Sequence, residues 1–173
     1  DLVVTASGFT KSGAGQLVTS SGMALLGGGS VTVTAGRLEV RKGSSNFTGN
    51  IVVNSGLYVA RFTPYANQFG DTNGTTTVNA DGQAKFQDPV SFTCAETWNL
   101  NGFRADGSLQ LDYADATLTG PVNIGTNTHL NINTYNHATR HTRLQGAIDD
   151  GPATGGVTFT IGYGGAASGA DLQ

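Results

Sequence analysis

Three aspartates lie close together in the stretch ADGSLQLDYADA: Asp106, Asp112 and Asp115. Carboxylates paired across a cleft carry out glycoside hydrolysis, so this cluster suggests a polysaccharide-cleaving enzyme. Strand periodicity argues against that interpretation: if Leu109 and Leu111 point inward, Asp115 falls beyond a corner and the three acids need not share a face. We therefore favour turn and surface roles for all three, and predict no catalytic residue and a protein that is not an enzyme.

An aromatic run in the stretch LYVARFTPYANQFG consists of Tyr58, Phe62, Tyr65 and Phe69. Exposed aromatic rings stack on sugars or dock a partner, so these four residues are the candidate ligand-binding site. The alternative is a loop with buried aromatics that covers the side or the end of the fold. In either case Pro64 interrupts a regular strand, and we expect an irregular insertion around residues 61–75.

The sequence offers few candidate metal ligands. His129, His137 and His141 cluster in HLNINTYNHATRH, but no helical pattern places two of them on one face, so surface positions are favoured. DTNG at 71–74 has oxygen-rich positions of a calcium loop without the downstream bidentate carboxylate. The single cysteine, Cys94, is interpreted as a small buried hydrophobe. We expect no metal site and no cofactor, with weak calcium binding left open.

The composition predicts a single all-β domain. Charged residues make up 12% of the 173 residues, against roughly 25% in an ordinary globular protein. Glu occurs only twice, while Val, Thr, Tyr and Phe favour strands over helices. The net charge of −3 and the scattered basic residues argue against a nucleic-acid partner. No apolar run approaches the roughly 20 residues that cross a bilayer, so no membrane span is expected.

The sequence repeats itself with a period near 20 residues. VTVTAGRLEV at 31–40 aligns without gaps with IVVNSGLYVA at 51–60, and SLQL at 108–111 aligns with HLNI at 129–132 at a spacing of 21. TVNADGQAKF at 77–86 has the same order of strand, small residue, glycine and strand, with Asp81 as an extra residue. Within each unit apolar residues alternate with polar ones, the pattern of a strand with one buried face.

Stacking of such units predicts the architecture. A unit of this size cannot bury its apolar side alone, whereas strands that pair with their equivalents one turn later, about 4.8 Å away, bury a continuous core. We predict a parallel β-helix, a β-solenoid of roughly eight rungs, as one domain over 1–173 with a flexible C-terminal tail around 164–173. An antiparallel β-sandwich is the alternative, because short strands at regular spacing also fit that fold.

Ten residues follow the order Thr-Lys-x-Gly-x-Gly-x-Leu and then Val-x-Ala-Gly-x-Leu-x-Val: Thr10, Lys11, Gly13, Gly15, Leu17, Val33, Ala35, Gly36, Leu38 and Val40. This pattern resembles the autotransporter-associated β-strand repeat, and NFTGNIVVNSG at 46–56 is similar to a partial second copy. The resemblance implies a right-handed β-helix in the passenger of a bacterial surface protein, usually one stretch of a much longer chain. The repeat is structural and brings no catalytic residues, and the aromatic middle from Tyr58 to Phe103 departs from it.

These features together predict a structural or adhesive module of a secreted or cell-surface bacterial protein, located outside the cell. A start at Asp1 without methionine is expected of a processed or excised chain. Because the ends of a solenoid expose unpaired strand edges, we expect self-association into fibres, or contact with the rest of a longer chain. Two alternatives stay open: a polysaccharide-binding or polysaccharide-cleaving β-helix with carbohydrate as its partner, and a phage tail-fibre segment.

Overall fold

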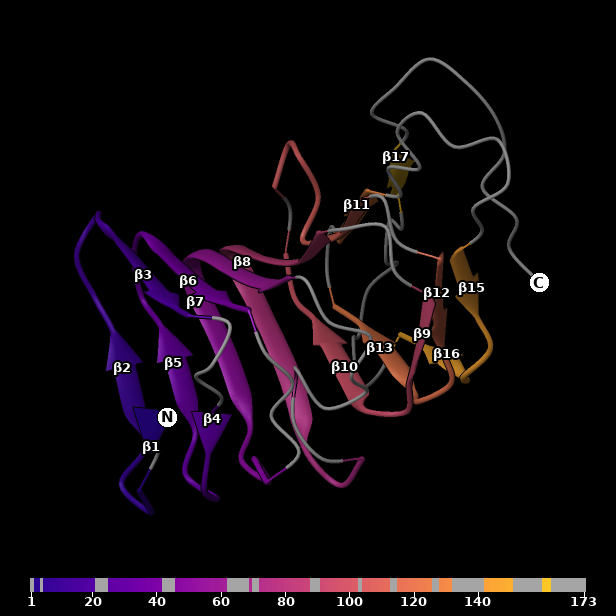
Figure 1. The fold of residues 1–173 in the computed structure, drawn as a ribbon. Helices are drawn as coiled ribbons and strands as arrows, with labels where there is room; N and C mark the ends of the chain where they lie inside the picture. Colours follow the sequence, from indigo (N-terminus) through magenta and orange to yellow (C-terminus); the bar gives the residue numbers. More distant parts are fainter. Residues whose placement is uncertain are drawn as a thin grey trace.

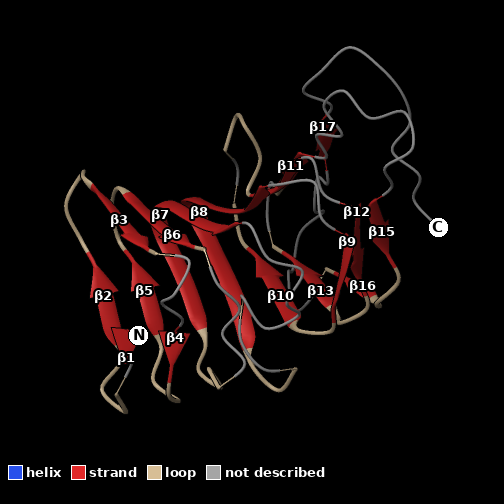
Figure 2. Ribbon diagram, in the orientation of Figure 1, coloured by secondary structure: helices blue, strands red, loops and turns tan. Residues whose placement is uncertain are grey.

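The fold consists of parallel strands wound into a β-solenoid. The computed structural model describes residues 2–3, 5–20, 25–41, 46–61, 69, 72–87, 91–102, 104–112, 115–125, 128–131, 142–150 and 160–162. No helix occurs among these residues, and turns such as the one between β2 and β3 connect neighbouring strands (Figure 1, Figure 2). Most of the insertion expected around 61–75, and all of the tail expected around 164–173, lie outside the described residues.

Two long stacks of strands share one twelve-stranded sheet. The first stack contains β2 (Phe9–Lys11), β5 (Val31–Val33), the first part of β7 (Ile51–Arg61), the first part of β8 (Thr75–Gln87), β10 (Thr97–Leu100), β13 (Val122–Ile124) and β16 (Ile148–Asp149). The second stack contains β3 (Gln16–Thr19), β6 (Arg37–Val40), the second parts of β7 and β8, β11 (Leu109–Asp112), β14 (His129–Asn131) and β17 (Thr160–Gly162).

Two shorter sheets complete the walls. The third stack contains β9 (Ser91–Cys94), β12 (Asp115–Leu118) and β15 (Thr142–Leu144). Nearer the N-terminus, β1 (Leu2–Val3) pairs with β4 (Leu25–Leu26), and Gly27 forms an isolated parallel bridge with Phe47.

In the C-terminal half, consecutive strands along the chain belong to the three stacks in a fixed order. β9, β10 and β11 lie in the third, first and second stacks, and β12 to β14 and β15 to β17 repeat that order. Every strand pair in the described part of the chain is parallel, so the alternative of an antiparallel β-sandwich is wrong. Figure 1 shows the chain advancing along one axis from the indigo N-terminal strands to the yellow C-terminal ones.

Buried side chains form columns along this axis. Two columns line the first stack: Val31, Ile51, Thr76, Trp98 and Val122, and then Val33, Val53, Val78, Leu100 and Ile124. A third column, in the second stack, is Leu38, Tyr58, Ala84 and Leu109. Successive side chains along a strand point alternately to the core and outward. Because paired residues point to the same side of the wall, the same positions face the core in the next turn.

The register confirms the repeat alignment that the sequence predicts. Val31 pairs with Ile51, and Leu109 pairs with Leu130. The extra residue expected in β8 is also present, but it lies between Val78 and Asp81, because Asp81 itself pairs with Ser55. The bulge accommodates this residue, after which the pairing of the two strands resumes in the second stack.

The corner between the first and second stacks requires glycine at Gly36. Its φ of 71° lies in the left-handed region, where other residues are strained. A Cβ at this position would lie 2.3 Å from the carbonyl oxygen of Gly15 and 2.4 Å from that of Gly13. Both carbonyls belong to the preceding corner, so consecutive corners approach too closely for a side chain. This close approach explains why a glycine, Gly36, follows Ala35 at this corner.

Replacing Gly36 by alanine is therefore expected to destabilise the fold more than replacing Gly13. Gly13 has a similar φ of 76°, but a Cβ there would meet nothing within 4 Å. Gly13→Ala adds only backbone strain of roughly 1–2 kcal/mol, whereas Gly36→Ala adds a steric conflict of about 1–3 kcal/mol as well. Thermal unfolding followed by circular dichroism measures both, and equal losses would contradict this account of the corner.

Candidate functional site

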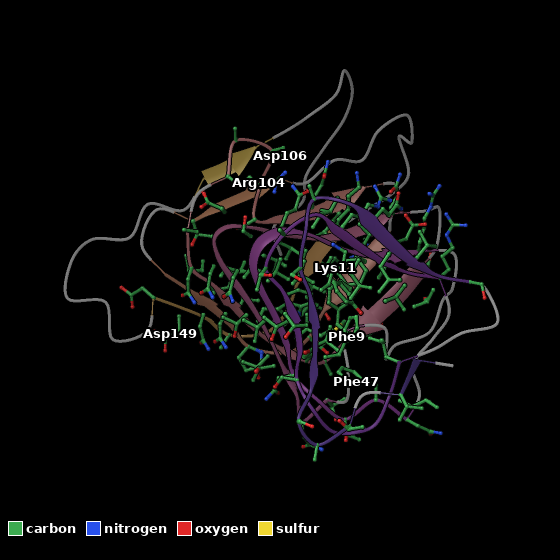
Figure 3. All side chains as sticks on the ribbon, turned by 90° about the vertical axis from the view of Figure 1, so that its left-hand side faces the viewer. Phe9, Lys11, Phe47, Arg104, Asp106 and Asp149 are labelled. Carbon is green, nitrogen blue, oxygen red and sulfur yellow. The ribbon has the colours of Figure 1, made fainter. Side chains whose placement is uncertain are left out.

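The three aspartates of the sequence cluster lie at different places on the solenoid. Asp106 lies in the corner before β11, where its Oδ1 is 2.5 Å from Nε of Arg104 (Figure 3). Asp112 ends β11 in the second stack, and Asp115 begins β12 in the third stack, in register with Ser91. The backbone therefore places Asp106 in a corner and Asp112 and Asp115 on strands of two different stacks, and turn and surface roles for the three stay a prediction.

The aromatic run contributes two residues to the core. Tyr58 and Phe69 are buried, with ring centroids 4.9 Å apart, and Phe69 also lies 4.4 Å from Phe86 and 4.9 Å from Trp98. These tilted contacts are typical of stabilising aromatic pairs. Phe62 and Tyr65 lie outside the described residues. A ligand-binding role for the run would therefore depend on those two, because the Tyr58 and Phe69 rings are enclosed.

The core also contains a carboxyl group that the sequence interpretation did not single out. Glu96 is 1% exposed, and its Oε1 accepts a hydrogen bond of 2.8 Å from the hydroxyl of Thr76. Its Oε2 has no hydrogen-bond partner among the described residues. Burial raises the pKa of Glu96 to about 8, and the Thr76 hydrogen bond lowers it only in part. At neutral pH this carboxyl is therefore mainly protonated.

The neighbours of Glu96 are also held in their neutral forms. Cys94 is buried, as predicted, and burial raises the pKa of its thiol to about 12. Burial raises the pKa of Tyr58 as well, and the negative charge of ionised Glu96 adds to that effect. A signal for this site exists in the sequence, because the alternation that buries Cys94, Trp98 and Leu100 places Glu96 on the same inward side.

The second glutamate has the opposite surroundings. Glu39 is also buried, but on the outer side of the second stack, where its carboxylate pairs with Arg37, with Arg41 at 2.5 Å and with Arg61 at 3.6 Å. Gln16 donates a further hydrogen bond of 3.1 Å. Burial raises the pKa of Glu39, but hydrogen bonds from Arg41 and Arg37 and their positive charges outweigh burial, so the pKa lies below its ordinary value.

Lys11 connects the first two corners. In register it corresponds to the buried Val33, and its side chain is 8% exposed. Its Nζ donates hydrogen bonds to the carbonyl oxygens of Ser12 at 2.8 Å, Gly13 at 2.7 Å and Ala35 at 3.1 Å. The first two carbonyls lie in its own corner and the third lies in the next one. Lys11 thus satisfies backbone acceptors that a valine would leave unpaired.

Arg104 has a similar role farther along the same line of corners. Its Nη1 donates to the carbonyl oxygens of Gly56 at 3.3 Å and Asp81 at 3.2 Å, one from β7 and one from β8. Gln83 adds hydrogen bonds to the carbonyls of Asp106 at 2.9 Å and Gly107 at 2.6 Å. Side-chain donors therefore replace strand pairing where the backbone turns.

The residues considered as metal ligands do not form a cluster in the described part of the chain. His129 lies in β14, while His137 and His141 lie outside the described residues. No group of three or more His, Cys, Asp or Glu side chains is placed to share an ion among the residues that the structure describes. The absence of a metal site and of a cofactor stays a prediction, and so does the weak calcium binding that the sequence left open.

Comparisons with known proteins give no relative. No protein-family model, no curated protein and no solved structure matches this chain. No helix suited to crossing a membrane was found in the described part of the chain.

Glu96→Gln is expected to stabilise the fold at alkaline pH. In the unfolded chain this carboxyl ionises near pH 4.5, but in the fold it remains protonated to about pH 8. The contribution of the Glu96 carboxyl to stability is therefore fully present below pH 4.5 and is lost as pH rises through 8. The gap between the two pKa values corresponds to at most about 5 kcal/mol, and urea unfolding of parent and variant from about pH 4 to pH 9 measures it.

Glu39→Gln is the matched control with the opposite sign. Because the pKa of Glu39 is lowered, its contribution is present above the ordinary pKa of 4.5 and is lost as pH falls through the folded value. The variant should be less stable than the parent at neutral pH, with the difference shrinking in acid. If both variants show the same pH dependence, the assignment of the two environments is wrong.

Proposed function

We propose that this chain is a structural and adhesive β-solenoid module of a secreted or cell-surface bacterial protein, and that it is not an enzyme. The finer geometry belongs to the same proposal: a right-handed helix of roughly eight rungs, in which each turn adds one parallel strand per wall. The resemblance of Thr10 to Val40 to the autotransporter-associated repeat supports the extracellular location.

The position of exposed apolar side chains is the observation that carries the proposal. Among the described residues, the exposed large hydrophobic side chains are Val3, Leu17, Val18 and Ile148, at 63%, 37%, 36% and 49%. All four lie on terminal strands, namely β1, β3 and β16. The side walls carry none in the described part of the chain, so the apolar surface that lacks cover is concentrated at the two ends.

The terminal strands also present unused pairing edges. β3 pairs with β6 on one side, and β16 pairs with β13 on one side, in the described part of the chain. Such an edge is a template for a further parallel strand, and Leu17 continues the column that begins with Leu38. A further rung from a longer chain, or the opposite end of a second copy, fits this edge. Head-to-tail contacts between copies do not close on themselves, so they produce fibres.

Leu17→Lys is expected to reduce end-to-end assembly. A lysine at the end of an apolar column opposes the approach of another rung, because its charge would have to be buried. The purified parent chain should form fibres under the electron microscope and sediment as large species, whereas the variant should remain dispersed at the same concentration.

Val52→Lys is the matched control, because Val52 is half-buried on the outer side of the first stack, away from the ends. It should assemble like the parent chain. Dispersed parent chains at high concentration, or equal loss of fibres in both variants, would contradict assembly through the ends.

A further inference from the structure

The outer side of the first stack is an ordered array of neutral polar side chains, which we call the polar face. It consists of Ser30, Thr32, Thr34, Asn50, Asn54, Thr75, Thr77, Asn79, Thr97, Asn99, Asn101 and Asn123, with Val52 and Pro121 interspersed. All of them are half-buried or exposed. The described residues of this face include no charged side chain from Ser30 to Asn123, and Asp149 follows in register after Asn123. In the view along the solenoid axis, Asp149 lies at the outside whereas Phe9 and Lys11 lie toward the middle (Figure 3).

Hydrogen bonds between successive strands fix the side chains of the polar face. Nδ2 of Asn123 donates to Oδ1 of Asn99 at 2.8 Å, and Nδ2 of Asn99 donates to the hydroxyl of Thr77 at 3.3 Å. In the next column, Nδ2 of Asn79 donates to Oδ1 of Asn54 at 2.7 Å. The amides therefore point along the axis in a common direction, and binding does not have to order them.

Each amide in the ladder keeps hydrogen-bonding capacity for a ligand. An asparagine side chain has two N–H donors and two acceptor lone pairs. Asn99 uses one of each within the ladder, so one donor and one acceptor remain on a half-exposed side chain. Sugar hydroxyl groups also combine a donor with an acceptor, and they carry no charge.

We infer that the polar face binds a neutral polysaccharide laid along the solenoid axis. The five levels from Thr32 to Asn123 repeat at about 4.8 Å, which gives a track of roughly 20 Å for an extended polymer. An anionic polymer would find no cation on this track, which disfavours nucleic acid and acidic glycans as ligands. Many weak contacts along one chain make binding depend on polymer length, so a monosaccharide binds poorly.

The polar face lies on the side of the solenoid, so binding there is independent of assembly through the ends. Carbohydrate on this face would contact polar side chains and not the aromatic run. The side-chain array remains accessible when further rungs are added at either end, since the outward direction is perpendicular to the axis.

The test is binding of the purified chain to a panel of polysaccharides. Cellulose, chitin, dextran and a soluble β-glucan are the neutral members, and alginate and heparin are the acidic ones. Co-sedimentation and affinity electrophoresis should detect binding to at least one neutral polymer, with weaker binding of its short oligomers. Binding to none of the neutral polymers, or to the acidic polymers alone, overturns the inference.

Variants locate the binding. Asn99→Ala with Asn123→Ala should weaken binding by about tenfold, or about 1.4 kcal/mol, because the ligand loses its hydrogen bonds to two amides. Gln110→Ala with Thr117→Ala is the matched control from the second and third stacks, and it should bind like the parent chain. Thermal unfolding checks the fold of each.

A second variant keeps the test valid if the first fails to fold. Thr97→Ala with Asn101→Ala removes polar groups from the same face, and the ladder contact of Asn101 with Asn79 is long, at 3.5 Å. Folded variants of the polar face that bind like the parent chain overturn the assignment of the site.

Discussion

The fold depends on one constraint, the parallel hydrogen-bonded register between strands that lie one turn apart. This register places each residue directly beside its equivalents in the neighbouring turns. Apolar side chains therefore form columns, as in Val33, Val53 and Val78, and polar ones form ladders. Stacked like charges would repel at this spacing, which accounts for the small share of charged residues, 12% of the chain. The same constraint stacks glycines at corners, where Gly56 pairs with Gly82.

The two glutamates show how this scaffold accommodates charge. Glu39 faces outward, and three arginines around it stabilise the carboxylate. Glu96 faces inward, and a single hydroxyl from Thr76 meets it, so the neutral acid is the favoured form. Alternation decides which side of the wall each residue occupies, and the partners on that side decide its protonation. The Lys11 side chain differs from both because its charge meets backbone carbonyls at a corner.

Different parts of the solenoid suit different roles. The corners are constrained by close backbone contacts, and the core columns by packing, so neither offers a surface to a ligand. The ends combine unused strand edges with exposed apolar side chains, which suits extension by further rungs. The polar face of the first stack is half-buried or exposed at each of its described residues from Ser30 to Asn123. We therefore assign assembly to the ends and binding to the side, and the two can operate together in an adhesive fibre.

The sequence by itself determined the solenoid architecture and the partners within its gapless repeats, but not the spacing elsewhere, which grows from 20 residues between Val31 and Ile51 to 31 between His129 and Thr160. Gapless alignment of 31–40 with 51–60 gives the observed partners, because residues that lie one repeat apart in the sequence pair with each other in neighbouring turns of a solenoid. The inward position of Glu96 was also readable from its phase with Cys94 and Trp98. Only the tertiary structure decided the contacts that do not follow from strand register. One is the packing of the Phe69 ring among Tyr58, Phe86 and Trp98. Another is the pair of hydrogen bonds from Arg104 to the carbonyl oxygens of Gly56 and Asp81. Periodicity fixes the level and side of a residue, but it does not fix how far a long side chain extends or which loop residue enters the core.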